Sequence, residues 1–186
     1  MSDHVDEINS VVKFYKDNQH RLIQFQASVE AFFSKHPKLT QKPFPIIHSI
    51  KTRLKDPDHL KDKIQRKLSD GVQISNDNLF GKITDLIGIR VLHLYQDQFP
   101  IIHTEILKYI EQGDWTFVEE PKAMTWDPES KKMYDDLKIT TEIRSTFYTS
   151  VHYLIKPNNN NPNPICCEIW ILRTKLRQAF RFHCAS

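Results

Sequence analysis

The chain has 186 residues, which is enough for one domain with a sizeable hydrophobic core. Its 39% hydrophobic and 26% charged residues are ordinary for a globular protein, and a formal net charge of +3 alone does not indicate a nucleic-acid-binding protein. The N-terminal segment is acidic, unlike a secretory signal, and the sequence has no apolar run of roughly 20 residues, so we expect no membrane partner. The three cysteines do not form a disulfide framework, which predicts reduced thiols in a cytoplasmic protein.

The N-terminal third of the chain predicts helices. Apolar residues recur at helical spacing over residues 5–34, which indicates one broken helix or two. Asp58 is then expected to cap a helix that runs to about Lys67, because Leu60 and Ile64 would share one face of it.

The remaining segments alternate between strand and helix patterns. Residues 88–95 predict a central strand, 96–110 an amphipathic helix and 116–118 a short strand. Residues 119–138 combine prolines with charged residues, and this composition predicts a loop or a mobile insertion.

The last predicted elements form a hairpin. Its strands cover residues 150–156 and 165–172, and an asparagine-rich turn connects them. We therefore predict an α+β fold with a single mixed β-sheet and flanking helices. Residues 1–40 are expected to form a helical segment that packs on a domain made of residues 41–186.

A run of cations precedes and enters the predicted capped helix. If this segment is extended, Lys51, Arg53 and Lys55 lie on one face, and His59 and Lys63 follow at helical spacing. Fixed positive charge near a helix N-terminus is suited to a triphosphate, although the same residues are also compatible with a solvated basic face.

Two acidic residues accompany strands. Asp85 stands just before the predicted central strand and is either a turn residue or a Mg²⁺ ligand. Glu168 interrupts an apolar strand and, with Asp85, could hold Mg²⁺ against a polyphosphate. Arg90 lies within an otherwise apolar strand, so it requires a carboxylate partner or a ligand.

A third group lies at the start of the predicted hairpin. Tyr148, Ser150 and His152 alternate along the strand and therefore face the same way. An aromatic ring, a hydroxyl and an imidazole on one face could stack on a base and contact its phosphates, although an ordinary half-buried strand would also show this pattern.

In this order, the motifs resemble the synthetase domain of the RelA/SpoT homologue family, especially its small alarmone synthetases, over about residues 40–174. The resemblance implies a nucleotidyltransferase-like synthetase fold and an ATP:GTP/GDP 3′-pyrophosphotransferase that makes the alarmone (p)ppGpp with Mg²⁺. The residues that the resemblance assigns to ATP are Lys51, Arg53, Lys55, His59 and Lys63. The residues that it assigns to the acceptor nucleotide are Arg144, Tyr148, Ser150 and His152. It assigns metal binding to Asp85 and Glu168, and catalysis to these two residues and Arg90.

The chain departs from the family pattern in its C-terminal part. Trp170 stands where the family has Gln, and Arg173 follows Glu168 by five residues instead of four, so the two point to opposite faces unless a bulge intervenes. Lys175–Ser186 replaces an acidic, aromatic helix, so we expect a truncated or divergent end. Two alternatives therefore stay open: an enzyme that transfers pyrophosphate to tRNA or to adenine nucleotides, and an inactive nucleotide-binding module. The protein could also form a homo-oligomer.

Overall fold

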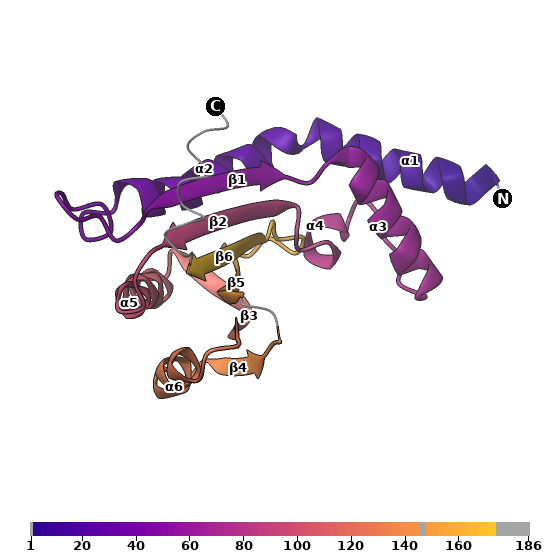
Figure 1. The fold of residues 1–186 in the computed structure, drawn as a ribbon. Helices are drawn as coiled ribbons and strands as arrows, with labels where there is room; N and C mark the ends of the chain where they lie inside the picture. The colour runs from indigo at the N-terminus through magenta and orange to yellow at the C-terminus, as the bar shows by residue number, and fades with distance from the viewer. Residues whose placement is uncertain (1, 146–147, 174–186) are drawn as a thin grey trace, which may run out of the picture.

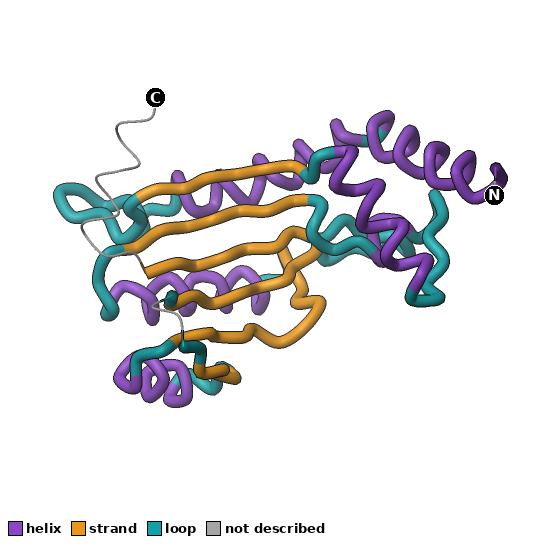
Figure 2. Tube along the Cα trace, turned by 45° about the vertical axis from the view of Figure 1, so that its right-hand side comes forward, coloured by secondary structure: helices purple, strands orange, loops and turns teal. Residues whose placement is uncertain are grey.

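The computed structural model describes residues 2–145 and 148–173. Within these residues, one six-stranded sheet carries all the strands, in the order β1-β2-β6-β5-β3-β4 (Figures 1 and 2). The strands are β1 (Ser49–Leu54), β2 (Ile87–His93), β3 (Trp115–Thr125), β4 (Thr140–Ile143), β5 (Thr149–Pro157) and β6 (Cys167–Arg173). The helices are α1 (Ser2–Asp17), α2 (Gln19–Lys35), α3 (Pro57–Ser69), α4 (Leu79–Lys82), α5 (Gln98–Glu111) and α6 (Pro128–Asp136).

The sheet is mixed, as the sequence predicts. β2 pairs in parallel with β6, and β3 pairs in parallel with β4, whereas the other neighbouring strands are antiparallel. The predicted hairpin is confirmed, since β5 and β6 are adjacent and antiparallel. β2 lies between β1 and β6, so it is an interior strand as predicted.

Helices α2 and α5 cover one face of the sheet. α2 runs alongside β1 and contacts both β1 and β2, while α5 contacts β3 (Figure 1). The buried side chains of α2, including Phe32 and Phe33, join a core with Ile89 of β2 and Ile169 of β6. Burial of these apolar side chains supplies the main driving force that holds the helices on the sheet. The two N-terminal helices are separated at Asn18, in agreement with the broken helical pattern.

The predicted cap of the helix after β1 is wrong by two residues. Asp56, and not Asp58, is the N-cap of α3, and its Oδ1 accepts hydrogen bonds from the backbone N–H groups of Asp58 (2.9 Å) and His59 (3.2 Å). Pro57 occupies the first helical turn, where its missing N–H has no consequence. This cap starts α3 directly after β1, at the end of the sheet (Figures 1 and 2).

The prediction that residues 119–138 form a loop is also wrong. β3 continues to Thr125 through two register shifts, one on each side of Glu119, and Pro121 lies in the second of these. Such irregularities accommodate a proline and disturb the alternation from which strands are recognised. Asp127 then caps α6, with Pro128 in its first turn.

The cysteines that the structure describes are structural. Cys166 and Cys167 are buried and free of disulfides. Burial raises the pKa of the Cys166 thiol to about 11 and that of Cys167 further, so both stay protonated at neutral pH. In the part of the chain that the structure describes, every helix is too short or too polar to cross a membrane.

Candidate nucleotide-binding site

The face of the sheet opposite the core helices carries several of the predicted site residues. Strand register places Lys51, Arg90, Trp170 and His152 in one row across β1, β2, β6 and β5. Arg53 and Glu168 stand in the neighbouring row, with Gly88 between them. Directly paired residues in neighbouring strands project to the same side, so these six side chains share what we call the open face: Lys51, Arg53, Arg90, His152, Glu168 and Trp170.

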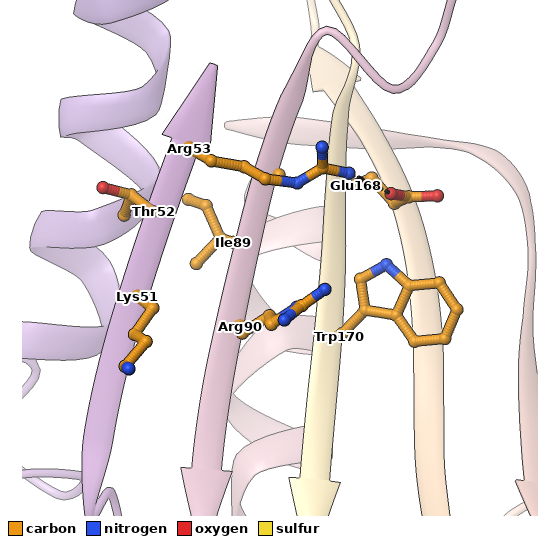
Figure 3. A pocket seen from close by; sticks show the side chains of 8 residues that line it. Lys51, Thr52, Arg53, Ile89, Arg90, Glu168 and Trp170 are labelled. Atoms are coloured by element: carbon orange, nitrogen blue, oxygen red, sulfur yellow. Dashed lines mark ion pairs between the residues drawn. The ribbon is translucent and has the colours of Figure 1, made fainter. Parts of the chain in front are cut away.

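A cavity of about 290 Å³ lies on the open face. We call it the sheet cavity, and its lining comprises Lys51, Thr52, Arg53, Gly88, Ile89, Arg90, Glu168 and Trp170. Figure 3 shows Arg53 of β1 reaching toward the Glu168 carboxylate and Arg90 of β2 pointing toward the Trp170 indole of β6, while Lys51 points along β1. Arg90 is exposed at this cavity, so it is not a buried cation that must have a carboxylate partner, and the other predicted option, a position that faces a ligand, stays a prediction. Three cations facing one acidic group leave an excess of positive charge, which favours an anionic ligand.

Gly88 allows the Arg53 side chain to cross the sheet. A Cβ atom on Gly88 would lie 2.9 Å from Arg53 Nε and 3.2 Å from its Cγ, and the three nearest atoms to that position all belong to Arg53. Because Gly88 has no side chain, Arg53 lies flat over β2 and brings its Nη2 to 3.9 Å from Glu168 Oε2 (Figure 3). The glycine thus serves a close approach, and no unusual backbone conformation is involved.

Glu168 is held by several donors. His152 Nε2 lies 3.0 Å from Glu168 Oε1, and His152 Nδ1 lies 3.9 Å from Glu119 Oε1. Partial burial would raise the pKa of Glu168, but hydrogen bonds from His152 and Trp170 outweigh it and hold the pKa below its usual value. Glu168 is therefore an ionised hydrogen-bond acceptor at neutral pH.

A second cavity, of about 250 Å³, lies where β1 leads into α3. We call it the helix cavity, and its lining comprises Lys55, Lys63, Arg66, Lys67, Asp70 and Asp85. Lys55 and Lys63 stand beside Asp85, with each Nζ 2.7 Å from one of its oxygens, Oδ2 and Oδ1 respectively. Four cations and two carboxylates make this cavity net positive.

Asp85 is the acidic centre of the helix cavity. Burial would raise its pKa, but the two lysines outweigh this effect and hold the pKa below its usual value. Its Oδ1 is buried and accepts no well-aligned hydrogen bond, although Lys63 stands beside it. An ionised oxygen of this kind fits a hard cation such as Mg²⁺, which usually takes one or two protein carboxylates together with waters and substrate phosphates. No group of three or more His, Cys, Asp or Glu that could enclose a metal is found among the described residues.

Most of the residues predicted to bind ATP line the two cavities. Lys51 and Arg53 line the sheet cavity, together with the predicted catalytic residue Arg90, while Lys55 and Lys63 line the helix cavity. His59 is exposed near the start of α3 and lines neither cavity.

The predicted acceptor residues are more scattered. Tyr148 is 45% exposed. Partial burial raises the pKa of Tyr148, and the positive charge of Arg90 opposes this rise, so the two side chains lie near one another. Ser150 is fully buried, and its hydroxyl is therefore not offered at the open face. Arg144 follows β4, pairs with Glu142 at 2.9 Å and lines neither the sheet cavity nor the helix cavity.

Seven lining residues were not assigned from the sequence: Thr52, Gly88, Ile89 and Trp170 of the sheet cavity, and Arg66, Lys67 and Asp70 of the helix cavity. Periodicity accounts for four of them. Arg66 and Lys67 follow Lys63 by three and four residues, the spacing that places side chains on one helix face. Gly88 and Trp170 share the face of their neighbours Arg90 and Glu168 because they lie two residues away along the same strands. Helical and strand periodicity, applied outward from the first candidates, would have found all four.

The departure at Arg173 follows the predicted geometry. β6 pairs with both neighbours without a register shift, so Arg173 and Glu168 lie on opposite faces of the sheet. Arg173 donates hydrogen bonds to Gln96 Oε1 (2.7 Å) and Asp127 Oδ2 (3.0 Å), and thereby links β6 to the start of α6. It therefore contributes to the fold and not to the open face. The predicted divergence of residues 175–186 lies outside the described residues.

Comparison with known proteins agrees with this geometry. A family model described as a region found in RelA/SpoT proteins matches residues 52–180, which is more than half of the chain. Comparison with curated protein sequences gave no match.

The fold is shared with solved structures of low sequence identity. Small alarmone synthetase 1 from Bacillus subtilis has a TM-score of 0.53 and 16% identity over 92% of this chain and 74% of its own. The same protein bound to its product pppGpp has a TM-score of 0.51 and 18% identity over 91% and 79%. The smu.1046c protein from Streptococcus mutans UA159 has a TM-score of 0.53 and 17% identity over 92% and 75%. With the family match over most of the domain, the motifs on the open face and the shared fold, the chain belongs to the RelA/SpoT family.

Proposed function

We propose that this protein transfers a pyrophosphoryl group from ATP to the ribose 3′-hydroxyl of GDP or GTP, which yields the alarmone (p)ppGpp. The observation that carries the proposal is the pair of net-positive cavities along β1 and α3, each with a partly buried carboxylate, Glu168 or Asp85. Membership of the RelA/SpoT family supports it.

The two cavities are suited to one extended donor nucleotide. Arg53 and Lys55 stand two residues apart on the same segment, so β1 leads from the sheet cavity directly into the helix cavity. Each cavity is near or below the lower end of the roughly 300–1,000 Å³ usual for ligand sites, so a ligand that spans both is favoured. The base would lie beside Arg53 and Arg90, whose planar guanidinium groups can stack on it. The triphosphate would be held by Lys55, Lys63 and Arg66 in the helix cavity.

Asp85 is the residue that would hold Mg²⁺ here, together with the donor phosphates, and Glu168 is its second candidate ligand. The metal, when bound, would neutralise charge on the polyphosphate. Lys55 and Lys63 now neutralise Asp85, and both lysines would turn to the phosphates when a nucleotide enters. The chain thus holds its phosphate-binding cations in place through the same carboxylate that is offered to the metal.

The transfer itself requires alignment and a proton acceptor. The 3′ oxygen of the acceptor forms a bond to the β-phosphorus of ATP. The bond from that phosphorus to the oxygen shared with the α-phosphorus breaks, and AMP leaves with the electron pair. Glu168 would accept the hydroxyl proton, since it is ionised and is oriented by His152. Tyr148, near Arg90, would stack on the guanine of the acceptor, with Arg144 and His152 nearby.

The test is transfer of label from γ-labelled ATP with Mg²⁺ to GDP, GTP, AMP or deacylated tRNA, each supplied separately. We expect label on GDP or GTP, and its loss in Asp85→Asn. Asp62→Asn is the matched control, because it removes one exposed carboxylate of α3 and should leave transfer unchanged. Label on tRNA or AMP would keep the chemistry and replace the acceptor. Binding of ATP by the folded protein without transfer to any acceptor would refute the enzymatic proposal in favour of a nucleotide-binding module.

A further inference from the structure

The sheet cavity contains a large aromatic residue to which the proposed reaction assigns no role. Trp170, the middle residue of β6, pairs in register with Arg90 on one side and His152 on the other. Among the described residues that line the cavity, Trp170 alone is aromatic. A large aromatic ring among cations and a carboxylate offers the cavity a flat apolar surface that none of its other lining residues provides (Figure 3).

The position of Trp170 is not that of a core residue. Its neighbours Ile169 and Ile171 point to the opposite face and belong to the buried core beneath the helices. Trp170 itself is partly exposed on the open face. Its burial within the fold therefore does not account for the large apolar surface that it presents to the cavity.

The indole is also held in a fixed orientation. Its ring lies 4.7 Å from the His152 ring, centroid to centroid, at an interplanar angle of 37°. Its ring nitrogen points toward the Glu168 carboxylate, whose pKa the indole N–H helps to lower (Figure 3). With one edge fixed in this way, the ring offers its remaining surface to the cavity, and a preorganised aromatic surface binds a planar base at little entropic cost.

We propose that Trp170 stacks on the purine base of the donor nucleotide and so sets the base selectivity of the sheet cavity. The inference rests on the proposed function, because the donor triphosphate in the helix cavity directs its base toward β1 and β6. Arg90, the direct neighbour of Trp170 on β2, would contact the base with its guanidinium group. A purine offers more stacking surface than a pyrimidine, so the pairing favours purine nucleotides.

Two substitutions separate stacking from the effect of the indole N–H on Glu168. Trp170→Phe keeps an aromatic surface and removes the N–H, whereas Trp170→Gln keeps a donor and removes the ring. Binding is measured by calorimetry with ATP, UTP, GDP and inorganic tripolyphosphate, and thermal unfolding of each variant verifies that it is folded. We expect Trp170→Gln to weaken ATP binding about tenfold, which is the scale of one lost base stack. Tripolyphosphate binding should stay unchanged, and Trp170→Phe should lose less than about threefold for ATP.

Intrinsic fluorescence gives an independent readout that needs no catalysis. ATP should quench the tryptophan fluorescence of the wild-type protein. Trp126→Phe removes a tryptophan that lies outside the cavity lining, so this variant should keep the quenching, whereas Trp170→Phe should lose it. The proposal is overturned if ATP affinity is equal in the wild type and Trp170→Gln, if tripolyphosphate binding falls in parallel, or if the loss affects GDP and not ATP. A protein that binds ATP through Trp170 but transfers no label would refute the proposed function alone, whereas a wild type that binds no ATP would refute both.

Discussion

Gly88→Ala tests whether the close approach of Arg53 to the sheet matters for the site. The new methyl group would lie 2.9 Å from Arg53 Nε, closer than real Cβ contacts allow, so the arginine must leave its path across β2. The displaced side chain is half exposed and has space to move toward solvent. The substitution should therefore alter the position of Arg53 without disturbing the backbone.

The expected change in stability is small. A glycine within a strand costs about 0.5–1 kcal/mol relative to alanine, so the substitution gains this amount. The ion pair that it breaks is 3.9 Å long and its arginine is half exposed, and such pairs contribute about 0–1 kcal/mol. The two effects nearly cancel, and we expect the melting temperature to change by less than about 4 °C.

The expected change in function is larger. A stacking contact between a base and a side chain such as the Arg53 guanidinium contributes about 1–3 kcal/mol, which corresponds to roughly 5- to 150-fold in affinity. We therefore expect Gly88→Ala and Arg53→Ala each to weaken ATP binding about tenfold. Calorimetry with ATP measures the affinity, and label transfer to GDP measures kcat/KM.

The double variant decides the mechanism. If Gly88→Ala acts through Arg53, the variant that carries both substitutions should bind ATP as Arg53→Ala does, because the displaced side chain is already absent. Additive losses would mean that Gly88 acts through something other than Arg53. A loss of more than about 2 kcal/mol in the free energy of unfolding of Gly88→Ala would also contradict the reasoning, since the structure shows Arg53 as the group that must move.

Three further substitutions test single contacts. Asp85→Asn should lower the free energy of unfolding by about 2 kcal/mol in urea denaturation, because its two lysine partners are left facing one another in a partly buried cavity; unchanged stability would contradict this. Arg173→Ala should cost about 1–2 kcal/mol through its lost bonds to Asp127 and Gln96 while ATP binding stays unchanged, and a loss of binding would contradict its place on the far face. His93 has its pKa lowered to about 4 by burial, so the unfolded chain takes up a proton between about pH 6.5 and pH 4 and stability falls on acidification through that window. The free energy of unfolding, measured by urea denaturation, should fall by about 2 kcal/mol between pH 7 and pH 5, and by much less in His93→Asn.

The sequence predicts the central strands well, for a physical reason. β2, β5 and β6 are interior strands whose apolar residues pack beneath the helices, so their composition alone distinguishes them from loops. β3 is harder to recognise, because its irregular pairing around Glu119 breaks the alternation of its second half. β4 has only four residues, mostly exposed, and its strand conformation depends on its pairing with β3.

The site was predictable to the extent that spacing determines it. Two-residue periodicity places Lys51 beside Arg53, and the same rule would have added Trp170 to Glu168. The contact between Lys55 and Asp85 spans thirty positions of the chain, and it forms because both residues meet at the end of β1 near α3. No local pattern contains that information, since it depends on the tertiary arrangement of the sheet and helix.

β6 carries cavity-lining residues on one face and residues that stabilise the fold on the other, and Arg173 lies on the second of these faces. An even spacing from Glu168 would have placed its guanidinium on the open face, beside the three cations that line the sheet cavity with Glu168. The odd spacing instead places it on the opposite side, where Asp127 and Gln96 satisfy its donors. The open face still carries Lys51, Arg53 and Arg90, so an anionic ligand meets three cations there. The departure from the family spacing therefore removes a fourth cation from the open face without removing the conditions for nucleotide binding.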